Sequence, residues 1–296
     1  MQRRRLYGRD VSLQVRMAVT MLLLIALFLV FSFILFRVTH SALFLIVIPL
    51  GGLLVQYFLS DKMVLASAGA RMVDERQAPE LFGIVQRLAQ QADLPMPRVA
   101  LVDTAMPNAF ATGRNPKHAV VAVTTGLLQQ LSGRELEAVL AHEMTHIRNR
   151  DMVVMTMASS VAAVASFVIQ MAFWIGLASE DDRDNGNAFL IILLVSLAVG
   201  FISNILVMAL SRYREYAADR GGAILTGAPE QLASALLRIS GTMQHIPNQD
   251  LRQAQPLSAL YIASPRKVAS EFFSDHPSVE NRVARLQRLQ QQMVGR

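Results

Sequence analysis

The sequence predicts a mainly α-helical membrane protein, in which four transmembrane helices carry a cytoplasmic α+β domain with a small β-sheet. Three observations support this fold class. Of the 296 residues, 53% are hydrophobic and 17% are charged, whereas a soluble domain is about 45–50% apolar and ~25% charged. Four apolar segments are long enough to cross a bilayer. The polar parts of the chain contain both helix-period and strand-period patterns.

The four apolar segments are the predicted spans. A transmembrane helix needs about 20 consecutive apolar residues, and the segments that meet this need are residues 17–36, 42–60, 153–178 and 188–210. Pro49 is expected to kink the second segment without preventing a crossing. A polar turn at residues 179–187 joins the last two segments, for which a buried hairpin in a soluble fold is the alternative. A signal peptide is disfavoured for the first segment, because its apolar run is too long and a second span follows at once.

The distribution of basic residues predicts the orientation in the membrane. Five arginines precede the first span, which places the N-terminus in the cytoplasm. Four crossings then return both polar parts to the cytoplasmic side, so the formal charge of +6 reflects topology rather than nucleic-acid binding. The predicted organisation is a basic N-terminus with two spans, a first cytoplasmic part, a transmembrane hairpin and a second cytoplasmic part, at residues 1–60, 61–152, 153–210 and 211–296.

The two cytoplasmic parts contain recognisable local elements. Pro79 opens a helical pattern that ends before Pro95. The sequence Ser-Gly-Arg-Glu at residues 132–135 is a capping box, which begins a second helix. Further helices are expected at residues 229–239 and 278–293. Apolar, β-branched runs predict strands at residues 98–103, 108–113 and 118–124.

The sequence His-Glu-Met-Thr-His, residues 142–146, lies in the middle of the helix that the capping box begins. Residues four apart share one face of a helix, so His142 and His146 can present two imidazole nitrogens to one ion. The chain has no cysteine, which leaves histidines and carboxylates as ligands. Glu215 is the expected third ligand, and an even number of spans returns it to the side of the histidines. Two histidines, a distant carboxylate and an open fourth position are typical of catalytic Zn²⁺.

Several other residues near these motifs have open alternatives. Asp219 shares a helical face with Glu215 and can accept a hydrogen bond from the far nitrogen of a ligand histidine, or it forms a plain salt bridge. His276 either donates to an oxyanion or opens a helix. The histidines without a partner at metal-ligand spacing are expected to be structural, and they are His40, His118 and His245.

The chain resembles the HtpX-type membrane zinc metalloproteases of the gluzincin group. The resemblance rests on the spans together with the motifs HEMTHIRNRD at 142–151, SRYREYAAD at 211–219, His-Pro at 276–277 and Asn-Arg at 281–282. It implies a zincin-like fold with Zn²⁺ on His142, His146 and Glu215, Glu143 as the base and Asp219 as support. It also implies that His276 and Arg282 lie near the transition state. The substrate-facing edge strand would contain Asn108, Ala109, Phe110 and Ala111.

The functional hypothesis is therefore a membrane-bound endopeptidase with one Zn²⁺ per subunit. The resemblance implies quality control of membrane proteins at the bacterial inner membrane, with a cytoplasmic active site, polypeptide substrates and no nucleic-acid partner. The alternatives are a dedicated processing peptidase for a membrane or lipidated substrate, and a non-catalytic zinc-binding membrane scaffold. A metal transporter is disfavoured, because it would need ionisable residues within its spans.

Overall fold

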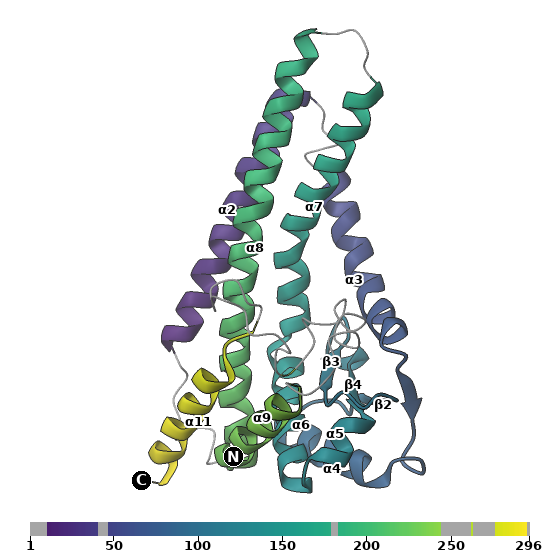
Figure 1. Ribbon diagram of the computed structural model, residues 1–296, viewed down its shortest axis with the longest axis vertical. Coiled ribbons are helices and arrows are strands. Elements are labelled where there is room, and N and C mark those ends of the chain that lie inside the picture. The colour runs from purple at the N-terminus through teal and green to yellow at the C-terminus, as the bar shows by residue number, and fades with distance from the viewer. Residues whose placement is uncertain (1–10, 41–46, 179–182, 244–261, 263–275, 295–296) are drawn as a thin grey trace.

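Figure 1 shows a computed structural model that describes residues 11–40, 47–178, 183–243, 262 and 276–294. Four long helices run together along the long axis of the molecule. They are α2 (Val11–Thr39), α3 (Ile48–Ser67), α7 (Asp151–Ala178) and α8 (Arg183–Thr226). At one end of this bundle lies a compact part that contains the sheet and the shorter helices (Figure 1).

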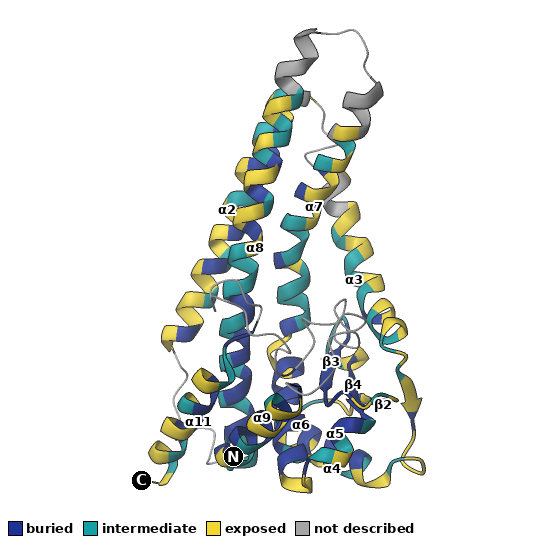
Figure 2. Cartoon of the chain, in the orientation of Figure 1, coloured by how far each residue is buried: buried dark blue, intermediate teal, exposed yellow. Residues whose placement is uncertain are grey.

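The long helices pack through a narrow apolar seam and expose the rest of their surface. Buried residues such as Phe31 of α2, Ala165 of α7 and Val199 of α8 form one apolar cluster. Figure 2 shows many exposed residues along these helices. Large apolar side chains are among them, and Leu22 and Phe201 are more than half exposed. Apolar patches of this extent are not stable in water. A lipid environment explains them.

Among the described residues, three helical segments are long and apolar enough to cross a membrane, namely Val11–Val38, Asp151–Met171 and Phe189–Thr226. The membrane character of the predicted fold class is therefore confirmed. The second predicted span, residues 42–60, is not among the three. Residues 41–46 lie outside the described part of the chain, and α3 carries the polar side chains Gln56, Asp61 and Lys62. The described helix is thus shifted toward the compact part and is less apolar than its neighbours.

Helix α8 corrects one prediction. Residues 183–187 were predicted as part of a turn, but α8 begins at Arg183 and continues through the predicted span to Thr226. Acidic residues such as Asp favour turns, but a negative charge also stabilises the first turn of a helix. Residues 179–182 lie outside the described residues. Glu215 and Asp219 therefore lie on the same continuous helix as the predicted span at residues 188–210.

The sheet has four strands in the order β1-β2-β4-β3. The strands are β1 (Arg71–Val73), β2 (Arg98–Val102), β3 (Ala109–Thr112) and β4 (Val120–Thr124). Strands β2 and β4 are parallel, whereas β1 and β3 pair antiparallel with β2 and β4, respectively. The three predicted strands are confirmed with shorter bounds, and His118 falls in the 3-10 turn η2 (Pro116–His118) instead. Because β3 is an edge strand, one side of its main chain can face the site.

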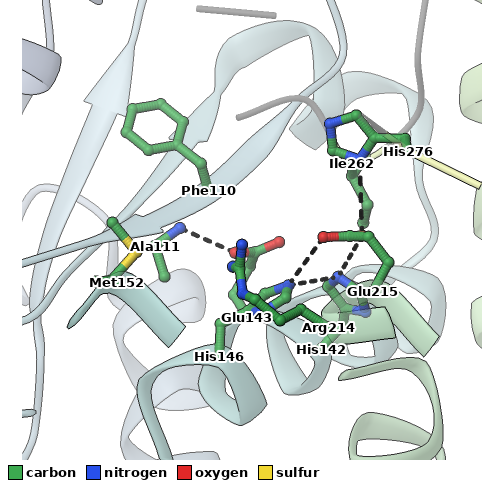
Figure 3. Close-up of a pocket in the computed structure, with 10 residues that line it drawn as sticks. All are labelled: Phe110, Ala111, His142, Glu143, His146, Met152, Arg214, Glu215, Ile262 and His276. Carbon is green, nitrogen blue, oxygen red and sulfur yellow. Dashed lines mark hydrogen bonds and ion pairs between the residues drawn. The ribbon is translucent and has the colours of Figure 1, made fainter. Parts of the chain in front are cut away.

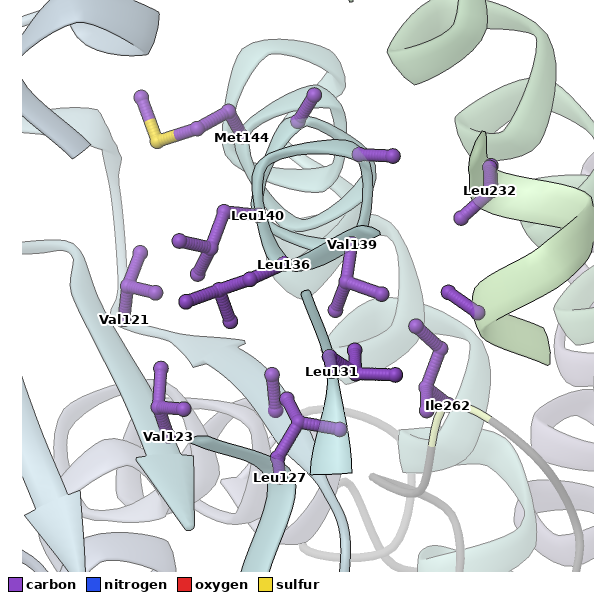
Figure 4. Close-up of a cluster of buried hydrophobic side chains, with 14 of the residues drawn as sticks. Val121, Val123, Leu127, Leu131, Leu136, Val139, Leu140, Met144, Leu232 and Ile262 are labelled. Atoms are coloured by element: carbon purple, nitrogen blue, oxygen red, sulfur yellow. The ribbon is translucent and has the colours of Figure 1, made fainter. Parts of the chain in front are cut away.

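Helix α6 (Gly133–Asn149) is the central element of the compact part. The predicted capping box is confirmed, since Ser132 and Glu135 exchange side-chain and main-chain hydrogen bonds. Val121 and Val123 of β4 pack against Leu140 and other apolar residues of α6 (Figure 4). The helices α4 (Pro79–Ala92), α5 (Thr125–Gln130), α9 (Pro229–Met243) and α11 (Val279–Val294) complete this part. The predicted helices are confirmed within a few residues, but β1 and α5 were not predicted.

Two glycines bring α8 close to α6. A Cβ atom built on Gly222 would lie 2.8 Å from the main-chain nitrogen of His142, and one on Gly221 would lie 2.3 Å from Cγ2 of Thr145. Real Cβ atoms do not approach other atoms this closely. The absence of a side chain at residues 221 and 222 therefore sets the spacing between the helix of the two histidines and the helix of Glu215.

Candidate metal centre

His142 and His146 of α6 and Glu215 of α8 converge on one point. One ligand atom from each side chain lies within 4.8 Å of the others, and all three residues are buried. The two Nε2 atoms are 3.1 Å apart. Each Nε2 lies 3.5 Å from a different carboxylate oxygen of Glu215 (Figure 3). Within the described residues no other group of three His, Cys, Asp or Glu side chains has this geometry.

The far nitrogens of both histidines contact carboxylates. Nδ1 of His142 lies 3.0 Å from Oδ1 of Asp219, and Nδ1 of His146 lies 2.6 Å from Oδ2 of Asp151. A carboxylate at this position fixes the imidazole tautomer with the hydrogen on Nδ1. The lone pair of each Nε2 then points into the space that faces Glu215.

This donor set fits a divalent cation. Two lone pairs at 3.1 Å repel each other unless a positive charge lies between them. Burial lowers the pKa of His146, but the hydrogen bonds to Asp151 and Glu215 outweigh burial and raise this pKa to about 10. The carboxylates thus stabilise positive charge at the point where the ligand atoms meet. Two imidazole nitrogens and one carboxylate are the ligands that catalytic zinc sites use.

Each supporting carboxylate is in turn close to an arginine. The guanidinium of Arg282 donates to both oxygens of Asp219, at 2.8 Å and 2.6 Å, and it also donates to the main-chain oxygen of Ile262. Burial lowers the pKa of Arg282, but the charge of Asp219 outweighs burial and raises it. On the other side, Nε of Arg214 lies 3.5 Å from Oδ2 of Asp151. Arg282 was expected near the transition state, and its Nη1 also lies 3.4 Å from Oε2 of Glu215.

Glu143 lies next to the two histidines and is 5% exposed. Its Oε2 accepts a hydrogen bond of 2.9 Å from the main-chain N–H of Ala111 in β3. Burial raises the pKa of Glu143, and the nearby histidines and this hydrogen bond only partly oppose the effect. The hydrogen bond between Glu143 and Ala111 therefore connects the His-Glu-Met-Thr-His motif directly to the edge strand β3. A group that exchanges protons benefits from a raised pKa.

The predicted substrate strand lies beside the site, but its side chains face different ways. Ala109 and Ala111 pack toward α6, whereas Phe110 packs on the opposite face of the sheet with residues such as Val120. Asn108 is buried, and its amide oxygen accepts from the main-chain N–H of Ile262 at 3.0 Å. The described strand can therefore offer its main chain along the free edge rather than a row of side chains.

A small cavity adjoins the ligand atoms and the edge strand. His276 lines this cavity together with Phe110, Met152 and Arg214 (Figure 3). Nδ1 of His276 lies 3.8 Å from Oε2 of Glu215, and the side chain is 6% exposed. The sequence singled out His276, and the structure brings it to the cavity.

The sequence reasoning missed Asp151 and Arg214. Both lie inside motifs that were recognised, directly after the helix of the two histidines and directly before Glu215. The available signal was an acidic residue that opens an apolar helix five residues after His146. Of the histidines expected to be structural, His118 is exposed and contacts Asn115, and His40 directly follows α2 with a positive φ of 52°. His245 lies outside the described residues.

Comparisons with known proteins identify the family of the chain. The model of Peptidase family M48 matches residues 75–290. A protease HtpX homolog from Moorella thermoacetica is 54% identical over 297 residues, which cover 99% of each chain. Protease HtpX homolog 2 from Methanosarcina mazei is 48% identical over 292 residues, which cover 98% of this chain and 99% of the relative.

A solved structure shows the same fold at greater distance. The crystal structure of S. mikatae Ste24p aligns with a TM-score of 0.51 and 18% identity, over 94% of this chain and 66% of that one. The predicted resemblance is confirmed by the family match and by the relatives. The chain belongs to peptidase family M48 and is an HtpX-type membrane metalloprotease.

Proposed function

We propose that His142, His146 and Glu215 hold one Zn²⁺ per subunit and that the enzyme cleaves polypeptides between α6 and the edge of β3. The observation that carries the proposal is the meeting of two Nε2 atoms and a carboxylate within 4.8 Å, beside a strand edge that contacts Glu143. Bound there, Zn²⁺ would lower the pKa of water toward ~7 and act as a Lewis acid.

Glu143 is the proposed proton carrier. The N–H of Ala111 holds Oε2 at 2.9 Å, which orients the carboxylate and leaves Oε1 to accept a proton from the attacking water. The pKa raised by burial suits a group that must give the same proton to the leaving amine. Transfer in both directions by one side chain needs no other base in the cavity.

The substrate is proposed to bind as an added strand along β3. The main-chain N–H of Thr124 in β4 donates to the oxygen of Asn108. Because hydrogen-bonded and non-hydrogen-bonded pairs alternate in an antiparallel ladder, the main-chain groups of Ala109 and Ala111 face the free edge. The N–H of Ala111 already donates to Glu143, so an extended peptide can pair with the oxygen of Ala111 and with the main-chain groups of Ala109. His276, at the cavity wall, is the proposed donor to the oxyanion.

Four further residues are proposed to position the ligands. Asp151 and Asp219 orient His146 and His142 through Nδ1, as carboxylates commonly do for metal-bound histidines. Arg282 fixes Asp219 with two hydrogen bonds, and Arg214 balances the charge of Asp151. Arg282 also lies 3.4 Å from Glu215, so we propose that it supports this ligand as well and lies near the transition state.

The membrane arrangement is proposed to have four spans, with α3 as part of the second, and a cytoplasmic active site at the bacterial inner membrane. The proposed parts are residues 1–60, 61–152, 153–210 and 211–296. Arginines flank the apolar segments on the side of the compact part, as the positive-inside rule requires. Glu215 follows the predicted span by five residues, or about 8 Å of helix. A site so close to the bilayer favours membrane proteins as substrates and a role in their quality control.

Purification in detergent, zinc analysis and a casein-cleavage assay test the catalytic proposal. Glu143→Gln should hold Zn²⁺ as the wild type does and lose cleavage by about 10²–10⁴-fold. Glu137→Gln is the matched control, because Glu137 lies on the same helix and pairs with Arg87 at 3.7 Å, away from the cavity. Wild-type cleavage by Glu143→Gln would refute the assignment.

The same assay separates the alternatives. A non-catalytic scaffold would bind Zn²⁺ without any cleavage by the wild type. A dedicated processing peptidase would cleave one membrane or lipidated substrate and leave casein and unfolded membrane proteins intact. No described contact favours either alternative over general proteolysis.

A further inference from the structure

Helix α8 has a largely uncovered face within the predicted span at residues 188–210. Figure 2 shows exposed residues along this part of α8, and Leu197 and Phe201 are 51% and 62% exposed. Val199 lies two residues from each of them, which on a helix is the opposite side, and it packs in the apolar seam with α2 and α7. The residues of the uncovered face, which we call the outer face, are Leu194, Leu197, Phe201, Asn204 and Met208.

Asn204 is the polar member of the outer face. Its side chain is exposed, and it lies six residues, or about 9 Å of helix, before the end of the predicted span at Leu210. It makes no hydrogen bond with the residues that the structure describes. Two serines of α7 differ, because Ser160 and Ser166 donate to main-chain oxygens of their own helix. Since hydrocarbon offers no hydrogen-bonding partner, the amide of Asn204 needs one from another helix.

The outer face continues along α8 to the metal centre. Helix α8 is continuous from Arg183 to Thr226, and Glu215 follows Asn204 by 11 residues. This separation is about three turns, so the two side chains project from the same face, about 16 Å apart along the helix. Met152 and Arg214, which line the cavity of the metal centre, lie close to the ends of the predicted spans. A helix that packs on the outer face therefore leaves the bilayer beside this cavity.

We propose that the outer face of α8 is a docking site for a transmembrane helix of the substrate, and that Asn204 forms a hydrogen bond with a polar side chain of that helix. The proposal rests on the proteolytic function proposed above. Apolar side chains do not select one helix over another in a bilayer, because lipid tails are equally apolar, whereas hydrogen bonds between polar side chains do.

This contact defines a class of substrate. In an assembled membrane protein, the polar side chains of transmembrane helices face the interior of the bundle and pair there. A helix that has lost its neighbours exposes these groups to lipid. Asn204 therefore selects membrane proteins that contain an unpaired polar side chain in a transmembrane helix.

The lower part of α8 favours a substrate helix over a second copy of this chain. Gly222 follows Asn204 by 18 residues, or five turns, so it lies on the same face, and a Cβ atom there would lie 2.8 Å from the main-chain nitrogen of His142. Helix α6 thus covers this face below the span. A second α8 on the outer face would also continue below the span, toward the space of α6. A substrate helix can end at the bilayer edge.

Cleavage of two reporter proteins in vesicles tests the proposal. Each reporter has one transmembrane helix joined at its cytoplasmic end to an unfolded segment, and the two differ only by Asn or Leu within the helix. The wild type should cleave the Asn reporter with a kcat/KM about 3–10-fold higher, which is the effect of one side-chain hydrogen bond in a membrane. Asn204→Leu should lose this preference. Gln170→Leu, which removes an exposed amide from α7, should keep it.

The ratio of the two rates separates this proposal from the proposed function. Equal rates for both reporters with the wild type, or the same preference in Asn204→Leu as in Gln170→Leu, overturn the docking site and leave the proteolytic function standing. A wild type that cleaves neither the reporters nor casein overturns both.

Cross-linking identifies the occupant of the outer face without any cleavage. The chain has no cysteine, so Phe201→Cys introduces a single thiol on this face. In a Glu143→Gln background, mild oxidation in vesicles should join it to a cysteine in the helix of the Asn reporter. Phe167→Cys, 42% exposed on α7, is the control and should join far less. If Phe201→Cys joins two copies of the protease and not the reporter, a second copy covers the outer face and the proposal is overturned.

Discussion

Gly222 offers the sharpest test of how the metal centre is held together. In Gly222→Ala the new Cβ would lie 2.8 Å from the nitrogen, 3.0 Å from Cα of His142 and 3.1 Å from the carbonyl carbon of Ala141. All three atoms belong to the main chain of α6, so no side-chain rotation relieves the contact. Because comfortable separations are about 3.5–4.0 Å, α6 and α8 must move apart by roughly 0.5–1 Å.

This displacement should separate Glu215 from the two histidines. Metal–ligand distances tolerate changes of about 0.2 Å, so the expected loss of zinc affinity is at least about tenfold. Overpacking of this kind costs about 1–3 kcal/mol, which outweighs the gain of about 0.5–1 kcal/mol from replacing a helical glycine. Zinc affinity is measured by competition with a chromophoric chelator, and stability by thermal unfolding.

Gly200→Ala is the matched control on the same helix. Its new Cβ would lie 3.8 Å from Cβ of Ala165, which is an ordinary contact. Gly200→Ala should bind zinc as the wild type does, and its stability should rise by about 0.5–1 kcal/mol because alanine favours the helix more than glycine does. Equal zinc affinities for Gly222→Ala and Gly200→Ala would show that close packing of α6 and α8 does not set the ligand geometry.

Three further predictions concern the support of the site. Asp151→Asn keeps an acceptor for His146 but loses the negative charge, so zinc affinity or activity should fall about 10–100-fold. A zinc affinity equal to that of the wild type, measured by competition with a chelator, would contradict this prediction. Glu135→Ala loses the capping box and the bond to Ser234, so stability should fall by about 2–3 kcal/mol while the folded protein keeps its zinc. The control Glu137→Ala, at a half-buried position of the same helix, should lose less stability. Removal of zinc by a chelator should lower the unfolding midpoint of the wild type and leave that of His146→Ala unchanged.

Local patterns were sufficient for the elements that surround the motif. The capping box and the four-residue spacing of the histidines act within one helix, so the sequence could place His142 and His146 on a common face. The strands that flank the site follow from short apolar runs. Strand β1 has only three residues, too few for a periodic signal, and its existence depends on pairing with β2.

The role suggested for Asp151 could not be derived from spacing alone. Arg150 ends α6 in the left-handed conformation, with φ of 56°, and this turn directs the start of α7 back toward His146. A residue five positions after a ligand would lie on another face if the helix continued. The contact at 2.6 Å therefore depends on a break in the helix that a pattern of apolar residues does not reveal.

The sequence by itself determined the class of metal donor, the helix that carries two of the donors and the apolar segments that demand a membrane, because these properties depend on residue types and on neighbours a few positions away. Only the tertiary structure decided how Glu215 reaches the histidines and which groups support them. The contacts of Glu215 with the histidines join residues about 70 positions apart, and their distances depend on how closely α8 can approach α6. The two helices can approach this closely because Gly221 and Gly222 have no side chain that would collide with α6. A pattern of residue types along the chain does not reveal such a contact.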